Sequence, residues 1–297
     1  MLKASAIESV TRQPSGTPAD TARVKNPVVS SQEDTYKDRG TAKNGGLYLY
    51  ALVESKINNP TGITGIDGQP VFAIPYRDVS AMVHACPVAP YKSDNQEVVT
   101  RWVMSHEHVL EEIISRGMNT IPFTFDTIIK PEKEREAGEV LTRWLSREYE
   151  VFLQKFEKVR KKKEYGIQVF ADRNAIRDAI AATSGTIQGL EDEAKKSGPG
   201  KMYLIRQKME KELKSATDAK IGIIISEITE KIRSYCDEIT MNKLRKGTGL
   251  EQDMILNCSC LVTDENYPRL GAVLEEIDQA GNLSVRFTGP WAVYSFV

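Results

Sequence analysis

The chain has 297 residues, of which 40% are hydrophobic, and its 40 lysines and arginines nearly balance its 41 aspartates and glutamates. That length is enough for two ordinary domains with buried cores, while a net charge of −1 gives no general attraction to nucleic acid or to an anionic lipid surface. No apolar run approaches the roughly 20 residues that cross a bilayer, and the sequence does not start like a secretory signal. We expect a cytoplasmic protein with no nucleic-acid or lipid-membrane partner.

The first 45 residues are rich in Ser, Thr, Pro, Asp and Lys and show no sustained periodicity. This composition predicts a disordered N-terminal arm. Strict alternation begins just after it and predicts a strand with two different faces. One face is expected to carry Leu47, Leu49, Ala51 and Val53, and the other Tyr48 and Tyr50. A second strand is expected at residues 79–83.

Two helices and a short strand follow in the first half of the chain. Residues 96–116 and 132–163 each carry an apolar stripe at helical spacing. Between them Ile121, Phe123 and Phe125 alternate on one predicted face, and Pro122 makes this an edge strand or its irregular end. A further strand is centred on Ile167. The order predicts a ferredoxin-like α+β domain over residues 46–163, with its helices on one face of the sheet.

Residues 164–297 are expected to form a second, modified ferredoxin-like domain with a helical insertion. Residues 174–196 predict a helix, which Ser197-Gly198-Pro199-Gly200 interrupts. A longer helix is predicted from residue 201 to about 245, with isoleucines at coiled-coil-like spacing and two glycines, Gly247 and Gly249, at its end. The insertion, residues 174–246, is therefore a predicted coiled-coil-like arm. A strand through Cys258, a helix from Pro268 and a strand at residues 283–287 complete this half.

The last nine residues are unusually aromatic for a chain end. They are Gly289-Pro290-Trp291-Ala292-Val293-Tyr294-Ser295-Phe296-Val297. Ends are usually polar and frayed, so this much aromatic surface is either docked on its own domain or kept for a partner, and the two readings can both hold. Trp291, Tyr294 and Phe296 are candidate partner-interaction residues, and Phe123 and Phe125 are two more.

No set of residues forms a credible catalytic or metal-binding motif. His106 and His108 are two positions apart, roughly 200° around a helix, whereas helical ligand pairs need a spacing of three or four. His106 lies on the apolar stripe, so we expect it to be buried and hydrogen-bonded. His84 follows a strand and could lie anywhere on the rim. The glycine-containing segments lack the spacing of dinucleotide and phosphate loops. We expect no enzyme activity, no cofactor and no metal.

The four cysteines, Cys86, Cys236, Cys258 and Cys260, are too few and too scattered for a secreted disulfide framework. Cys258 and Cys260 share one face of a predicted strand whose other residues on that face are apolar. A buried core position is therefore expected for both thiols. No histidine or further cysteine is spaced along the sequence to complete a metal or redox site.

Seven short segments between residues 46 and 297 occur in a distinctive order. They are Gly46-Leu47-Tyr48-Leu49-Tyr50-Ala51-Leu52-Val53, Gly62-Ile63-Thr64-Gly65-Ile66-Asp67, Asp78-Val79-Ser80-Ala81-Met82-Val83, His106-Glu107-His108-Val109-Leu110-Glu111, Ile121-Pro122-Phe123-Thr124-Phe125-Asp126-Thr127, Gly200-Lys201-Met202-Tyr203-Leu204, and Gly289-Pro290-Trp291 with Tyr294-Ser295-Phe296. In this order they resemble the gas vesicle accessory proteins of the GvpF/GvpL family.

The sequence departs from that family pattern in two places. The usual Leu-Pro-x-Arg-Phe-Gly-Thr has Thr124 and Asp126 in place of its Arg and Gly, and Ala292-Val293 replaces the usual Pro-Pro after Gly-Pro-Trp. A turn that relied on glycine at position 126 must accept aspartate, which tolerates a positive φ better than most residues. These departures fit a diverged paralogue with altered partner choice.

The resemblance implies a non-enzymatic accessory or minor structural protein for gas vesicle formation. Such a protein binds the hydrophobic shell protein and other accessory proteins during assembly, and is linked to the gas-facing side of the shell or to its early assembly complex. The alternative is a small-molecule-binding sensor or enzyme on paired ferredoxin-like domains. A deep cavity with convergent His84, His106 or Asp126 would favour that alternative, and a flat apolar surface near Trp291 would favour the assembly role.

Overall fold

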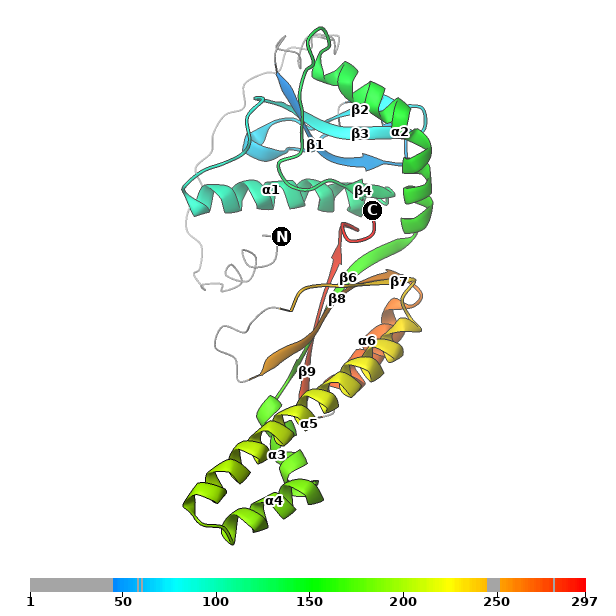
Figure 1. Ribbon diagram of the computed structural model, residues 1–297. Helices are drawn as coiled ribbons and strands as arrows, with labels where there is room; N and C mark the ends of the chain where they lie inside the picture. The colour runs from blue at the N-terminus through cyan, green and yellow to red at the C-terminus, as the bar shows by residue number, and fades with distance from the viewer. Residues whose placement is uncertain (1–44, 58, 60, 245–251, 280) are drawn as a thin grey trace, which may run out of the picture.

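The computed structural model describes residues 45–297 except 58, 60, 245–251 and 280 (Figure 1). Residues 1–44 of the predicted disordered arm and the two glycines expected to end the long helix lie outside the described residues. Within the described part, two antiparallel sheets and their helices form an α+β fold. Figure 1 shows the first sheet at the top, the second below it, and a helical arm at the bottom.

The first sheet has the strand order β2-β3-β1-β4, with β5 also pairing with β1. The strands are β1 (Gly46–Val53), β2 (Phe72–Tyr76), β3 (Val79–Cys86), β4 (Thr120–Pro122) and β5 (Ile128–Ile129). Strand β2, which contains Pro75, was not among the predicted strands. It lies at the edge of the sheet, where a missing backbone N–H is tolerated.

Helices cover both faces of this sheet, so the prediction of helices on one face is wrong. Helix α1 (Gln96–Ser115) packs on the face that carries Tyr48 and Tyr50. Helix α2 (Ala137–Val159) packs on the opposite face, over Leu47 and Leu49. Every residue of β1 is buried. A central strand that is apolar on both sides needs a covering layer on each of them.

A β-bulge at Tyr50 changes which residues of β1 share a face. Leu49 and Ala51 pair with consecutive residues of β3, so Tyr50 between them has no partner there. One extra residue reverses the alternation beyond it, and Ala51 and Val53 lie in the core on the tyrosine side. The predicted grouping with Leu47 and Leu49 is therefore wrong from Ala51 onwards.

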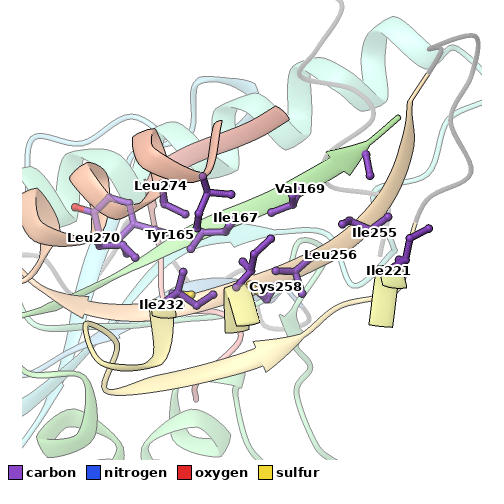
Figure 2. Packing of buried hydrophobic residues seen from close by; sticks show 14 of the residues in the cluster. Tyr165, Ile167, Val169, Ile221, Ile232, Ile255, Leu256, Cys258, Leu270 and Leu274 are labelled. Carbon is purple, nitrogen blue, oxygen red and sulfur yellow. The ribbon is translucent and has the colours of Figure 1, made fainter. Parts of the chain in front are cut away.

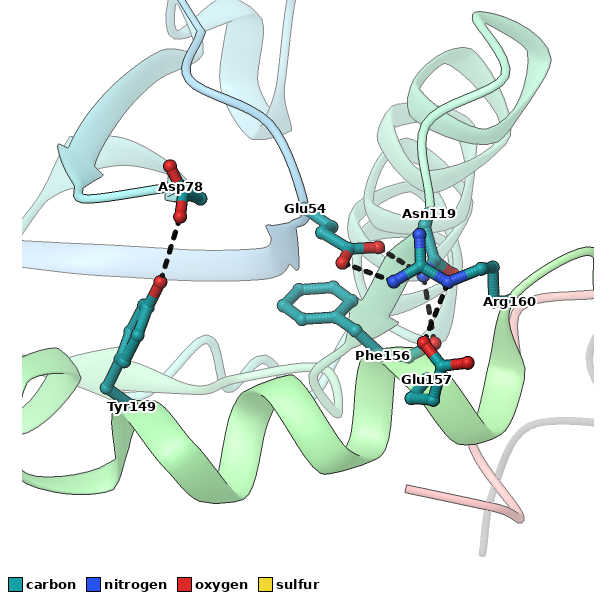
Figure 3. Close-up of polar contacts among 7 residues, drawn as sticks. All are labelled: Glu54, Asp78, Asn119, Tyr149, Phe156, Glu157 and Arg160. Atoms are coloured by element: carbon teal, nitrogen blue, oxygen red, sulfur yellow. Dashed lines mark hydrogen bonds and ion pairs between the residues drawn. The ribbon is translucent and has the colours of Figure 1, made fainter.

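The end of α2 is tied to the first sheet by a polar network (Figure 3). Arg160 follows α2, and its guanidinium lies 2.6 Å from Glu54 Oε1 and 3.0 Å from Glu157 Oε2. The Asn119 amide donates to Glu54 at 2.8 Å and to the carbonyl of Phe156 at 2.9 Å. These contacts fix where the chain leaves the first sheet.

The second sheet has the order β7-β8-β6-β9. Its strands are β6 (Lys162–Ala171), β7 (Glu238–Met241), β8 (Asp253–Thr263) and β9 (Leu283–Trp291). Helix α6 (Tyr267–Asp278) and the last turns of α5 (Pro199–Arg233) contribute to one core with this sheet. Figure 2 shows that core, which includes Tyr165, Ile167, Val169, Ile232, Cys258, Leu270 and Leu274.

The helical arm differs from its prediction at two points. The single helix expected over residues 174–196 is two, α3 (Arg173–Thr183) and α4 (Gly185–Lys195), because Ser184 ends the first and caps the second. Helix α5 ends at Arg233 rather than near residue 245, because the following residues pair with β8 as strand β7. The outer half of α5 packs on α4, where Ile205 lies in a small cluster with Leu190.

Candidate functional site

The C-terminal segment, residues 289–297, runs from the edge of the second sheet to the first sheet (Figure 1). It starts at Gly289, which has a φ of 122°. A Cβ atom at this position would lie 2.9 Å from the carbonyl oxygen of Glu164, so glycine allows β9 to approach β6 here. Farther on, Ala292 joins the core beneath α1, and Val293 packs in a cluster with Val159.

Glu164, at the start of β6, binds this segment. Glu164 is buried, with only 6% of its surface exposed. One carboxylate oxygen accepts the Ser295 backbone N–H at 2.9 Å, and the other accepts the Ser295 hydroxyl at 2.6 Å. The same hydroxyl lies 3.1 Å from Ser259 Oγ. A buried carboxylate needs such donors to offset its lost hydration, so Glu164 and Ser295 stabilise each other's positions.

Tyr294 connects the segment to α1. Its hydroxyl donates to Glu107 Oε1 at 3.1 Å and lies 3.0 Å from His106 Nε2. The other ring nitrogen of His106 lies 2.9 Å from the hydroxyl of Tyr48. A tyrosine hydroxyl has one proton, and Tyr294 uses its proton in the bond to Glu107, so Nε2 of His106 is the donor to Tyr294. Nδ1 of His106 then accepts the proton of the Tyr48 hydroxyl. His106 is fully buried, which confirms the expectation of a buried, hydrogen-bonded histidine.

His84, on β3, also has a tyrosine hydroxyl at each of its ring nitrogens. Its Nδ1 lies 2.8 Å from the hydroxyl of Tyr50, and its Nε2 lies 3.0 Å from the hydroxyl of Tyr91. Burial lowers the pKa of His84 to about 4, so the ring is neutral at pH 7. We call these six residues the histidine–tyrosine cluster: Tyr48, Tyr50, His84, Tyr91, His106 and Tyr294.

The cluster's hydrogen bonds leave little capacity for acid–base chemistry. Both ring nitrogens of His84 and of His106 are engaged with tyrosines. Burial raises the pKa of Tyr91 to about 12 and raises the pKa values of Tyr50 and Tyr294 further. A neutral imidazole between protonated phenols has no free nitrogen for a substrate or a metal. In the described part of the chain, no three His, Cys, Asp or Glu side chains are arranged to hold a metal ion.

Asp126 lies in the turn between β4 and β5 and binds two members of the histidine–tyrosine cluster. Its φ is 69°, which confirms that an aspartate is accepted at positive φ at this position. Its N–H donates to the hydroxyl of Tyr48 at 3.0 Å, and its carboxylate accepts the N–H of Tyr91 at 2.8 Å. The side chain that replaces glycine in the family pattern is therefore used to bind a neighbouring loop.

The five aromatic residues predicted from the sequence lie in four different environments. Trp291 is 40% exposed, and its indole N–H donates to Thr288. Tyr294 and Phe125 both reach the histidine–tyrosine cluster, and the ring centroid of Phe125 lies 6.0 Å from that of His106. Phe296 is 4% exposed, in the cluster of Val159.

Phe123 lies on the other side of the first sheet. Its ring packs edge-on against Trp144 of α2, with centroids 5.8 Å apart. The prediction that Phe123 and Phe125 share a face is wrong, because β4 ends at Pro122 and the chain turns before Phe125. Sequence reasoning missed Glu164, whose isolated carboxylate gives no signal. The two tyrosines on one face of β1 were the available sign of a buried polar cluster.

Exposed apolar side chains occur on both the C-terminal segment and the helical arm. On the first, Trp291 lies at the end of β9. On the second, Tyr203 and Leu204 of α5 are 62% and 64% exposed. No helix in the described ranges is both long and apolar enough to span a bilayer.

Comparisons with known proteins agree on one family. A family model described as gas vesicle synthesis protein GvpL/GvpF matches residues 46–297. Gas vesicle protein L1 of Halobacterium salinarum is 25% identical over 278 residues, which cover 91% of this chain and 96% of that protein. Gas vesicle protein L of Haloferax mediterranei is 26% identical over 243 residues, 78% of this chain and 72% of that protein.

A solved structure shares the fold. The crystal structure of the gas vesicle protein GvpF from Anabaena sp. PCC7120 aligns with a TM-score of 0.67 over 85% of this chain and 98% of that one. The two sequences are 22% identical in this alignment. The likeness therefore establishes a common architecture.

Proposed function

Because this chain belongs to the GvpL/GvpF family of gas vesicle synthesis proteins and so has a role in gas vesicle formation, we propose that it is a non-enzymatic accessory or minor structural protein. In this proposal it binds the hydrophobic shell protein and other gas vesicle accessory proteins during assembly. It works without a cofactor, in the cytoplasm and at the vesicle, on the gas-facing side of the shell.

The observation that carries the proposal is the exposure of Trp291 beside an anchored segment. Trp291 is 40% exposed, whereas Phe296 is 4% exposed and Ser295 is bound to Glu164. Large aromatic side chains on a fixed backbone are common anchors of protein interfaces, because little conformational entropy is lost when they bind. We therefore assign the direct contact to Trp291.

The other four candidate aromatic residues support that contact from within the fold. Tyr294 and Phe296 fix the backbone on both sides of Ser295, and Phe125 packs at the histidine–tyrosine cluster that Tyr294 joins. Phe123 holds the chain between β4 and β5 against α2. Their effect on a partner is indirect, through the position of Trp291.

The alternative of a small-molecule sensor or enzyme has less support. It needed His84, His106 or Asp126 to converge on a cavity. Each of these side chains instead binds another part of the chain: a tyrosine at every histidine nitrogen, and the N–H of Tyr91 at Asp126.

We further propose that residues 46–163 and 164–297 are two related ferredoxin-like domains. The two sheets have the same strand order, β2-β3-β1-β4 in the first and β7-β8-β6-β9 in the second. In each sheet the first strand of the domain therefore lies between its third and fourth strands. In the second unit helices α3, α4 and α5 connect the first two strands, and in the first unit a loop with a short 3₁₀ turn, Ile66–Gly68, takes that place. Helices α3, α4 and α5 form the proposed coiled-coil-like arm, a second surface for partners.

Co-purification with the shell protein tests the proposal. The tagged full chain is expressed together with the candidate shell subunit, as wild type, Trp291→Ala, and a Tyr203→Ala/Leu204→Ala double variant. We expect the wild type to capture the subunit and Trp291→Ala to lose about tenfold or more of the captured amount, with unchanged circular dichroism. Loss only in the double variant would move the contact to the arm. No capture by the wild type of any gas vesicle protein would contradict the proposal.

A further inference from the structure

The outer half of helix α5 presents one line of side chains to solvent. Leu204, Lys208, Lys211 and Ser215 follow one another at spacings of four, three and four residues, which places them on one side of the helix. All four are exposed, and Leu204 is 64% exposed. Tyr203, the residue before Leu204, is 62% exposed. We call these five residues the arm face.

The other helices of the arm pack on α5 and leave the arm face open. Figure 1 shows α3 and α4 beside the outer half of α5. Helix α4 packs on it at Ile205, which is buried and lies in a cluster with Leu190. Helix α3 is joined to it by an ion pair between Arg177 and Glu210. No residue of the arm face belongs to a buried cluster of the described chain, so this face is accessible to a partner.

The part of α5 that carries the arm face is positively charged. Residues 201–220 contain six lysines and arginines and three aspartates and glutamates, whereas the whole chain has a net charge of −1. Two of the three carboxylates, Glu210 and Asp218, form ion pairs with arginines of α3. The carboxylates that could neutralise the exposed lysines are therefore mostly occupied within the arm.

Lys208 and Lys211 have no ion-pair partner among the residues that the structure describes. The remaining carboxylate of this stretch, Glu212, lies four residues after Lys208, but no ion pair joins the two in the described part of the chain. Like charges one turn apart on the same side of a helix repel each other. Carboxylates brought by a partner would remove this repulsion.

We propose that the arm face binds an acidic amphipathic helix of another gas vesicle protein. This inference rests on the proposed function, in which the arm is a second surface for partners, and it names the chemistry of the partner. Carboxylates three or four residues apart on the partner face Lys208 and Lys211, and an apolar side chain packs against Tyr203 and Leu204. The line from Leu204 to Ser215 is about 17 Å long, roughly three turns of helix.

The positive charge argues against a second copy of this chain as the occupant. Two arm faces brought together would place lysines opposite lysines, which is unfavourable. An exposed ion pair adds little affinity, so Lys208 and Lys211 select an acidic partner. The exposed rings and methyl groups of Tyr203 and Leu204 supply the apolar area that is buried on binding.

Peptide binding to the full-length protein tests the inference. The probe is a synthetic amphipathic helix of about four heptads, with leucine at positions a and d and glutamate at e and g. A second peptide has lysine in place of every glutamate. In fluorescence anisotropy we expect the glutamate peptide to bind at least about tenfold more tightly than the lysine peptide, and to lose most of this advantage at about 0.5 M sodium chloride. Equal binding of the two peptides, or no binding of either, would overturn the inference.

Charge reversal on the same helix provides matched variants. Lys208→Glu/Lys211→Glu should bind the glutamate peptide at least about tenfold more weakly and should prefer the lysine peptide. Lys220→Glu/Lys231→Glu changes the charge of α5 by the same amount at two exposed lysines off the arm face, and should bind as the wild type does. Circular dichroism checks that both variants are folded. An equal loss in both would show attraction by net charge alone and would overturn the assignment to the arm face.

Two further comparisons separate this inference from its neighbours. Vesicles of phosphatidylglycerol are titrated as well, and tighter binding to them than to the glutamate peptide would make the arm face a lipid-binding surface and overturn the inference. Capture of the shell subunit, which is assigned to Trp291, is expected to persist in Lys208→Glu/Lys211→Glu. A wild type that captures the subunit but binds no glutamate peptide would contradict this inference and leave the proposed function standing.

Discussion

At the scale of single residues, Tyr294 links the C-terminal segment to helix α1. One hydroxyl group binds both His106 and Glu107 of α1, although Tyr294 is 187 or more residues away from them in the sequence. The bond to His106 extends through Tyr48 to the backbone of Asp126. A hydrogen-bond chain of this kind is stabilising only while every member is satisfied.

Removing the Tyr294 hydroxyl is expected to destabilise the protein. Tyr294→Phe leaves the ring in place but leaves His106 and Glu107 without this partner, so we expect the free energy of unfolding to fall by about 1–3 kcal/mol. Urea denaturation followed by circular dichroism measures it. Tyr203→Phe is the control, since it removes the same hydroxyl at a residue that is 62% exposed, and its change should stay within about 0.5 kcal/mol. Equal stability of the two variants would contradict the role assigned to Tyr294.

The buried histidine predicts a pH dependence. Burial lowers the pKa of His84 from 6.5 to about 4, so between these values the unfolded chain binds a proton that the folded chain does not. The free energy of unfolding therefore falls as the pH is lowered from about 6.5 to about 4, by on the order of 3 kcal/mol, and His84 contributes no change above this range. The neighbouring Tyr50 and Tyr91 stay protonated throughout, and Asp67 opposes the shift slightly.

Urea denaturation between pH 7.5 and pH 4.5 measures this contribution. Carboxylates also titrate in the range, so the comparison is between variants. His84→Gln should lose part of the wild-type pH dependence, and His108→Gln, at an exposed position, should retain all of it. Identical pH dependence in the wild type and both variants would show that His84 is not held neutral in the folded chain.

Single residues also show where sequence reasoning works. The buried state of His106 was predictable from its position on an apolar stripe. The positive φ of Asp126 was predictable only with the resemblance, because the family pattern has a glycine there and aspartate tolerates the left-handed region. Glu164 was not predictable. Its carboxylate is bound by Ser295, which lies 131 residues away in the sequence, so no local pattern marks the contact.

At the scale of elements, the long helix α5 shows why boundaries were harder to predict than elements. Its isoleucine pattern continues past residue 233 to Ile239, and nothing local separates the last turn of a helix from the first residues of a strand. The partner strand β8 decides, since Ile239 lies opposite Cys260. The same holds for β1, where the bulge at Tyr50 depends on the pairing with β3.

Two isoleucines of α5 test the packing of this helix. Ile232 is 0% exposed in the core of the second sheet, whereas Ile223 is 51% exposed on the same helix. Ile232→Ala should lower the free energy of unfolding by about 2–4 kcal/mol through lost burial and a cavity. Ile223→Ala removes the same atoms from the surface and should change it by at most about 0.5 kcal/mol. Guanidinium chloride titration would contradict the fold if the two variants were equally stable.

At the scale of the whole molecule, the α+β class and most of the longer elements were predictable from periodicity, and the family from seven short segments, whereas strands β2, β5 and β7 were not predicted. The arrangement of helices on both faces of the first sheet was not, because alternation in a strand does not tell which side is covered. The sequence predicted that the aromatic residues of the C-terminal segment are docked on their own domain, kept for a partner, or both. In the structure Phe296 is buried and Trp291 is exposed. This difference could be seen only once both sheets were placed.

The central claim is that this member of the GvpL/GvpF family supports gas vesicle formation through an anchored segment that presents Trp291. The most direct measurement is the number of gas vesicles in a gas-vesicle-forming cell that lacks this protein and receives it as wild type or as Trp291→Ala, at equal levels. We predict that the wild type restores vesicles and that Trp291→Ala yields about tenfold fewer. Full restoration by Trp291→Ala would contradict the role of that side chain, and no restoration by the wild type would contradict the account as a whole.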